Sequence, residues 1–186
     1  MSLSPVKRVI LETMWMVEKP AKAAEIAKEV GLGFPSVMMH IIGLTRMGYV
    51  ETPEKGHYAI TEEGRKTLGF PKIGRESAEK IFAYLPVEKS FHFYADVGKP
   101  LNLCAASLQD FCDKISKVGV GSIEFHLSRG DFEAWFTGLG DIELARKTLL
   151  FKEQKASGEE LRTKLYEIVK HRCDELAEIR QQSYPT

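Results

Sequence analysis

The stretch AKAAEIAKEVGLGFPSVMMHIIGLTRMGYVETPEKGHYAITEEGRKTL, residues 21–68, decides the fold of the N-terminal third of the chain. Apolar residues recur at helical spacing in two short segments, which are separated by a turn that contains Gly31. A Gly-Tyr-Val exit at residues 48–50 leads into two short alternating segments around a Pro-Glu-Lys-Gly turn. Thr61 is then placed to cap a short helix. The expected order is helix, turn, helix, hairpin, helix.

This order is that of a helix-turn-helix followed by a wing, an arrangement that places one helix in the major groove of DNA. Working outward, residues 5–18 form a further amphipathic helix that precedes it. In the second helix of the motif, opened by Pro35 and closed by Gly48, we expect three apolar residues to face inward: Val37, Ile41 and Leu44. Tyr58 and Ile60 share one face of the second strand and are expected to pack on that helix.

The charge of the chain is balanced, with 26 Lys and Arg against 26 Asp and Glu. Residues 1–70 carry 9 basic and 8 acidic side chains, and the remainder carries 17 and 18. Because affinity for DNA rests largely on neutralising phosphates, this balance argues against strong binding by a monomer. It predicts weak, salt-sensitive binding that a dimer would strengthen.

The composition, with 44% hydrophobic and 28% charged residues, is ordinary for a globular protein. No apolar run is long enough to cross a membrane, and the N-terminus lacks a signal pattern, so we expect a cytoplasmic protein without a membrane partner. Cys104, Cys112 and Cys173 form no C-x-x-C pair, which fits a reducing compartment and small buried side chains.

Gly69 to Gly74 break the periodicity, and we place a domain boundary there, between residues 1–70 and 71–186. The fold class expected for the whole chain is α+β and mostly helical, with a small sheet in the second domain. In that domain we predict strands over residues 90–95 and 122–127. Helices are expected from about residue 75, over 108–118, from Asp131 with Ser128 as its capping-box partner, from Asp141 to about 155, and over 159–181.

The first 68 residues resemble winged helix-turn-helix transcription regulators of the MarR, ArsR and PadR kind. The matching segments are Ala24-Glu25-Ile26-Ala27, the spaced residues Val37, Ile41 and Leu44 with Gly48-Tyr49-Val50, and Tyr58-Ala59-Ile60-Thr61-Glu62-Glu63-Gly64. The resemblance covers about a third of the chain and is specific for the fold. It is less specific for DNA binding, because winged helices also serve as protein-docking modules.

The outward face of the expected recognition helix departs from the pattern of these regulators, in which Ser, Arg, Lys or His are usual. Here Arg46 is the charged residue of that face, and Pro35, Met39, Ile42 and Gly43 lie beside it. Apolar side chains can contact thymine methyl groups, and hydroxyl or imidazole groups can bond base edges. The residues expected to contact DNA are Ser36, Met39, His40 and Arg46 on the helix, with Lys55 and His57 at the wing.

Residues 76–150 are similar to a domain of unknown function found mainly in archaea. The similarity rests on Phe91-His92-Phe93, Ala106-Ser107-Leu108-Gln109-Asp110-Phe111, Ser122-Ile123-Glu124-Phe125-His126 and the segment from Asp131-Phe132-Glu133-Ala134-Trp135 to Leu139-Gly140-Asp141-Ile142-Glu143-Leu144-Ala145. This resemblance implies no particular chemistry.

A metal or effector site is the sharpest chemical hypothesis in the second domain. If the strands over 90–95 and 122–127 pair, His92, Glu124 and His126 come to one face of the sheet, and two imidazoles with a carboxylate can bind zinc. The alternative is a half-buried polar face, because the spacing matches no metal motif. The motifs of catalysis and of phosphate or dinucleotide binding are lacking, so we expect neither an enzyme nor a cofactor.

The last helix carries an apolar stripe that includes Leu161, Leu165, Val169, Cys173 and Leu176. This stripe must be buried against its own domain or against a second subunit. A two-fold protein suits a palindromic operator, so we expect a homodimer.

Together these patterns predict a sequence-specific, dimeric transcription regulator that binds double-stranded DNA. The second domain would serve in dimerisation, in sensing a small-molecule effector or in docking a partner. One alternative is a protein-interaction adaptor whose winged helix binds no DNA, and a weaker one is a metal-dependent enzyme built on the second sheet.

Overall fold

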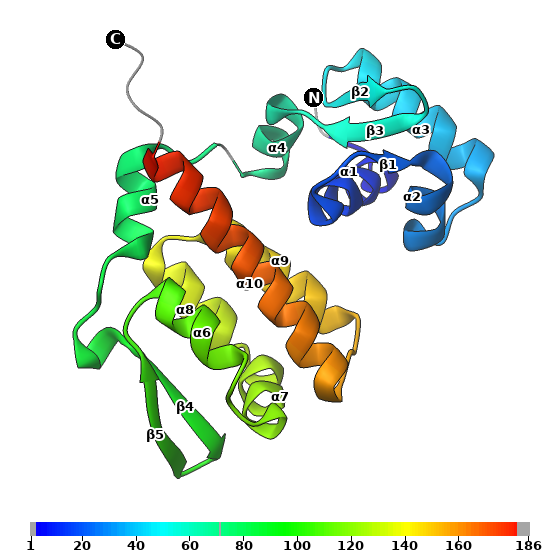
Figure 1. Cartoon of the computed structure of the whole chain (residues 1–186). Helices are drawn as coiled ribbons and strands as arrows, with labels where there is room; N and C mark the ends of the chain where they lie inside the picture. Colours follow the sequence, from blue (N-terminus) through cyan, green and yellow to red (C-terminus); the bar gives the residue numbers. More distant parts are fainter. Residues whose placement is uncertain (1–2, 71, 182–186) are drawn as a thin grey trace. The chain divides into compact units, whose positions relative to one another are not determined.

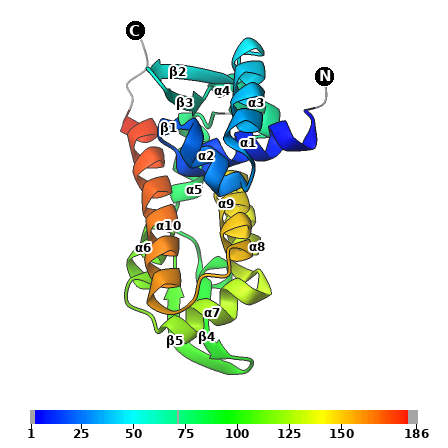
Figure 2. The ribbon, with the colours of Figure 1, turned by 90° about the vertical axis from the view of Figure 1, so that its right-hand side faces the viewer.

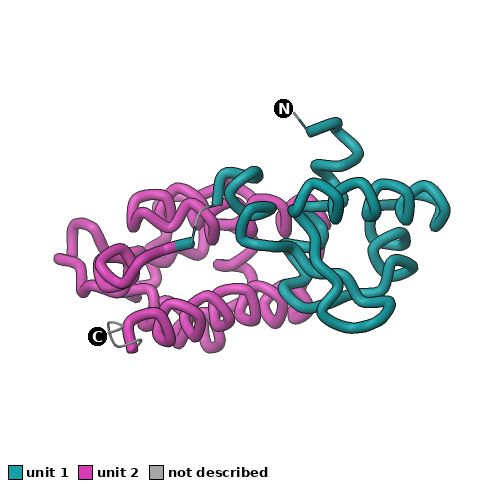
Figure 3. The backbone as a smooth tube through the Cα atoms, turned by 90° about the horizontal axis from the view of Figure 1, so that it is seen from above, with its two compact units in different colours: residues 1–72 teal, residues 73–186 magenta. Residues whose placement is uncertain are grey.

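The computed structural model describes residues 3–70 and 72–181, and within them the chain is α+β and mostly helical (Figure 1). Two compact units divide the chain, residues 1–72 and 73–186 (Figure 3). The division lies within the segment Gly69–Gly74, of which Pro71 is outside the described residues. No helix of the described ranges combines the length and the apolar character needed to cross a bilayer.

The first unit consists of four helices and three short strands in the residues that the structure describes. In chain order these are α1 (Pro5–Val17), β1 (Ala21–Lys22), α2 (Ala23–Val30), α3 (Phe34–Arg46), β2 (Val50–Glu54), β3 (His57–Ile60) and α4 (Glu62–Leu68). Each helix predicted from the sequence is found. The two-residue strand β1 was not predicted, because a segment so short has no periodicity.

The three strands form an antiparallel sheet in the order β1-β3-β2. Tyr58 of β3 pairs with Ala21, and Ile60 pairs with Val50. The Tyr58 hydroxyl donates to Met38 Sδ of α3 at 3.7 Å, so the expected packing of Tyr58 on this helix is confirmed. β3 is thus held both by its neighbouring strands and by α3.

Local capping residues mark the end of α2 and the start of α4 where the sequence predicts them. Gly31 ends α2 in the left-handed conformation, with φ of 70°, and the Thr61 hydroxyl accepts the amide of Gly64 at 3.1 Å to begin α4. Trp15 of α1 is buried and stacks on Phe70 with ring centroids 4.4 Å apart. The stack joins the first helix to the end of the unit.

In its described residues, the second unit is a helical bundle with one β-hairpin. Its elements are α5 (Arg75–Phe82), the 3-10 helix η1 (Val87–Lys89), β4 (Phe91–Asp96), β5 (Lys99–Ala105), α6 (Leu108–Ile115), α7 (Val120–Arg129), α8 (Asp131–Leu139), α9 (Ile142–Glu153) and α10 (Gly158–Gln181). In Figures 1 and 2, α10 lies beside α6 and α9, and the hairpin lies beside α7.

The prediction of a strand over residues 122–127 is wrong, because this segment lies within α7. Its buried residues are Ser122, Ile123, His126 and Leu127, which recur at spacings of three and four residues and so line one side of a helix. The partner of β4 is instead β5, in an antiparallel hairpin in which His92 is opposite Cys104. The alternation of apolar and polar residues in 122–127 was therefore coincidental.

The apolar stripe of α10 is buried within its own unit. Leu161, Leu165, Val169, Cys173 and Leu176 all belong to the core of the second unit. α10 packs against α5, α6, α7 and α9. The sequence left open whether the stripe is buried in its own domain or against a second subunit. It is buried in its own unit, so it does not supply a dimer interface.

A buried group of charges joins α9 to α10. Asp141 caps α9 by accepting the Leu144 amide at 3.1 Å, and its two carboxylate oxygens accept from Arg172 Nε at 2.8 Å and Nη2 at 2.9 Å. Arg172 also lies 3.1 Å from the carboxylate of Glu143, which is 3.6 Å from the ammonium of Lys147. Burial lowers the pKa of Lys147 to about 7, and the charge of Glu175 opposes this change.

Gly64 has the least room for a side chain of the glycines in the first unit, so one added methyl group should lower stability strongly. A Cβ at Gly64 would lie 2.4 Å from the Tyr49 carbonyl oxygen, which is backbone and cannot move aside. We expect Gly64→Ala to lower the free energy of unfolding of this unit by about 1–3 kcal/mol. Urea denaturation measures the change.

The matched control is Gly43→Ala in α3, where the added Cβ would meet the flexible Lys7 side chain at an ordinary 3.5 Å. This variant should be neutral or slightly stabilising, since Ala favours a helix over Gly. Equal free energies of unfolding for the two variants would contradict the predicted clash.

Candidate functional site

The third helix of the first unit presents one buried and one exposed side. Val37, Ile41 and Leu44 are fully buried, as predicted. On the opposite side Met39 is 65% exposed and Arg46 is exposed as well. Accessible side chains on one face of a helix are what a recognition surface requires.

Two further residues predicted to contact DNA, Ser36 and His40, are half-buried on the same helix. Lys55 is exposed at the turn between β2 and β3. His57 follows it, but its Nδ1 is buried, 3.8 Å from the Glu54 carboxylate. Of the predicted residues, Met39, Arg46 and Lys55 are therefore the most accessible, and one ring nitrogen of His57 is withdrawn from solvent.

Apolar side chains accompany these residues at the surface. Phe34 at the start of α3 is 52% exposed and Ile42 is 42% exposed, and Leu32 in the preceding turn is also exposed. The exposed part of α3 is thus more apolar than charged. Such a surface suits methyl groups and rings better than a bare phosphate backbone.

In the second unit the structure separates the three residues predicted to form a metal site. His92 lies on β4 and its Nε2 is 2.8 Å from the Val87 carbonyl oxygen, whereas Glu124 and His126 lie on α7. The Glu124 carboxylate accepts the Gly158 amide at 3.0 Å. The expected grouping on one sheet face is wrong, because it depended on residues 122–127 being a strand.

His126 is buried, and both of its ring nitrogens are engaged. Nε2 accepts the Tyr94 backbone amide at 2.9 Å, so the proton of the neutral ring resides on Nδ1, which donates to the Asp131 carboxylate at 2.8 Å. Burial lowers the pKa of His126, although the hydrogen bond that its ring donates to Asp131 acts in the opposite direction. His126 therefore fastens the β-hairpin to α7.

The same carboxylate accepts from Arg129 Nε at 3.2 Å. The expected capping box is not formed, because Asp131 is engaged in this way and the Ser128 hydroxyl donates to the Phe125 carbonyl. Gly130, with φ of 79°, makes the connection between α7 and α8 instead.

A pocket of about 310 Å³ opens beside His126, between the hairpin and α7. Its walls include the rings of Phe91, Tyr94 and Phe125. His92, Arg129 and Asp131 supply its other polar groups. The sequence indicated the two histidines, but no motif indicated Arg129 or Tyr94, because their proximity depends on how the hairpin docks.

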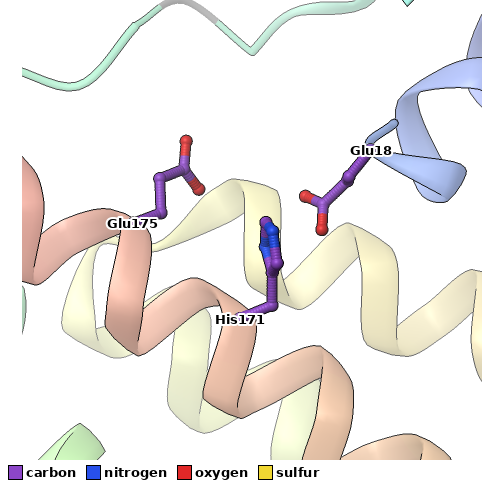
Figure 4. A group of neighbouring side chains, drawn as sticks. All are labelled: Glu18, His171 and Glu175. Carbon is purple, nitrogen blue, oxygen red and sulfur yellow. The ribbon is translucent and has the colours of Figure 1, made fainter. Parts of the chain in front are cut away.

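Within each unit, the described residues bring few potential metal ligands together. Figure 4 shows His171 and Glu175 on successive turns of α10, and the third labelled residue, Glu18, follows α1 in the other unit. Two potential ligands from one helix are fewer than a zinc site uses. Among the described residues, no three potential ligand atoms of one unit all lie within 4.8 Å of one another.

Cys112, which could be cast as a nucleophile, is fully buried on α6. Cys173 is buried as well, with its sulfur 3.9 Å from the Leu108 carbonyl oxygen. Both thiols pack in the core, as the prediction of small buried side chains requires.

Comparison of the chain with family models, with curated proteins and with solved structures gives no match.

The engagement of His126 predicts an acid-sensitive hairpin. Because burial lowers the pKa of His126 in the folded protein, the unfolded chain takes up the proton more readily than the folded one. The contribution of His126 to stability is therefore present above about pH 6.5 and is lost as the pH falls below this value. Protonated Nε2 can no longer accept the Tyr94 amide. We expect the hydrogen-exchange protection factor of that amide to fall as the solution is acidified.

His126→Gln should lower this protection at neutral pH and remove most of its acid dependence. His92→Gln, which changes the exposed histidine of the hairpin, is the control and should leave that dependence intact. Unchanged protection of the Tyr94 amide between pH 7 and 5 in the unaltered protein would refute the role of His126.

Proposed function

We propose that the first unit is a winged helix-turn-helix domain that binds double-stranded DNA and that the protein is a transcription regulator rather than an enzyme. One observation carries the proposal. α3 buries Val37, Ile41 and Leu44 on one side, leaves its other side accessible, and is followed directly by a hairpin with Lys55 exposed at its turn. A helix in the major groove with a wing beside it uses this combination.

In this proposal the side chains divide into two roles. Ser36, Met39 and His40 lie in the first two turns of α3 and contact base edges. Arg46 and Lys55 contact phosphates and set the position of the domain on the duplex. His57 contributes through the exposed part of its ring, since its Nδ1 is turned toward Glu54.

The proposal predicts a specific response to loss of one charge at the wing. Lys55→Ala should weaken binding to all DNA sequences alike and lower the salt dependence of the logarithm of the binding constant by about one unit. His40→Ala should instead change the preferred sequence. Selection of genomic fragments at low salt, followed by fluorescence anisotropy over a salt series, measures both effects.

Lys117→Ala, which removes an exposed lysine of the second unit, is the control and should leave the salt slope unchanged. If no genomic fragment binds the unaltered protein at low salt, the DNA-binding proposal fails.

A second candidate is favoured by the exposed Phe34, Met39 and Ile42. Three large apolar side chains on or beside one helix face are suited to a protein partner, and in that case the protein is an adaptor. Replacing Ile42, to which the DNA-binding proposal assigns no contact, with Lys distinguishes the two functions. An added cation increases the electrostatic attraction to DNA but disrupts an apolar protein interface.

We further propose that the regulator acts as a homodimer, because the balanced charge makes a single copy a weak DNA ligand. The dimer uses a surface other than the buried stripe of α10. Light scattering should give about twice the chain mass of 21.0 kDa at the concentrations used for DNA binding. A mass of one chain throughout the concentration range would exclude the dimer.

A further inference from the structure

The pocket between the β-hairpin and α7 has the features of a small-molecule site. Its volume of about 310 Å³ lies at the lower end of the range usual for ligand pockets. It belongs entirely to the second unit and is formed by residues separated by more than thirty positions in the chain, such as Tyr94 and His126. The hairpin turn, with Val97 and Gly98, provides one of its walls.

Aromatic rings dominate the inner surface. The His126 ring lies edge-on to Phe91, with centroids 4.9 Å apart, and to Phe125, with centroids 5.0 Å apart. Tyr94 adds a third ring at 6.2 Å from His126. Burial lowers the pKa of His126, and its Nε2 accepts the Tyr94 amide, so both features favour the neutral ring. These walls therefore favour a flat, apolar ring system over a charged or strongly hydrated group.

One cation stands at the edge of this aromatic surface. The Arg129 guanidinium lies over the Phe125 ring, 5.1 Å from its centroid, and its Nε donates to Asp131. The ring below and the carboxylate beside it hold the guanidinium in a fixed orientation, while the side chain stays 52% exposed. A positioned guanidinium is well suited to a planar carboxylate, which it can bind with two parallel hydrogen bonds.

Asp131 does not give the site an unpaired negative charge. Its Oδ2 accepts from both His126 and Arg129, so the carboxylate is used within the protein. An anionic ligand can therefore bind Arg129, because the Asp131 carboxylate that pairs with this guanidinium also accepts from His126. A cationic ligand would have to share the Asp131 carboxylate with Arg129.

We propose that this pocket binds a small aromatic carboxylate, with its ring against Phe125 and Tyr94 and its carboxylate on Arg129. The ligand would contact both the hairpin and α7, two elements that His126 already joins. This inference rests on the second unit alone and is independent of DNA binding by the first.

Isothermal titration of the full chain with benzoate and phenylacetate tests the proposal, and benzamide serves as an uncharged ligand of nearly the same shape. The carboxylates should bind at least about tenfold more tightly than benzamide, which corresponds to ~1.4 kcal/mol for the charged contact. Equal affinity of benzoate and benzamide, or no binding of either carboxylate at millimolar concentration, would overturn the assignment.

Arg129→Gln should weaken benzoate binding by about tenfold or more, and Arg129→Lys, which keeps the charge but loses the fork, should have an intermediate effect. The structure offers a matched control in Arg180, whose guanidinium lies over the Phe82 ring at the same 5.1 Å, away from the pocket. Arg180→Gln removes the same kind of contact and should leave binding unchanged. Equal losses in the two variants would contradict a role of Arg129 in binding the ligand.

Discussion

The second unit depends on the buried contact between Asp141 and Arg172. One carboxylate both begins α9, by accepting the Leu144 amide, and binds the guanidinium of α10 through two oxygens. Removal of Arg172 leaves the buried Asp141 carboxylate without its charge partner in the interior, at a cost of about 3–5 kcal/mol. The contact also fixes how α10 lies on α9, and α10 in turn packs on α5, α6 and α7. Since the hairpin docks on α7, its position also depends on this contact.

Most helices could be predicted because their signals are local. Gly31 and Thr61 define their helix ends through their own backbone and side-chain bonds, and the spacing of Val37, Ile41 and Leu44 identifies one buried face. Residues 122–127 show the limit of such signals. Six residues can satisfy a period of two and a period near four at the same time, and the choice is made by packing against β4, which the local sequence does not contain.

The candidate sites follow the same division. The outward side of α3 could be read from helical geometry, because one known buried face defines the opposite one. The environment of His126 could not be predicted from local sequence. It requires the Tyr94 amide, from a strand 32 residues earlier, and the carboxylate of Asp131, from the next helix. β5 was missed although Leu101, Leu103 and Ala105 alternate after the turn at Val97 and Gly98, which is a usable hairpin signal.

The chain contains two tryptophans, and each unit holds one of them in a different environment. Trp15 is buried and stacked on Phe70, whereas Trp135 donates its indole N–H to the Lys89 carbonyl at 3.0 Å and is only partly buried. Intrinsic fluorescence therefore contains one emitter for each hydrophobic core. A Trp→Phe replacement at either position would isolate the other emitter and show whether the two cores melt as one cooperative unit or as two.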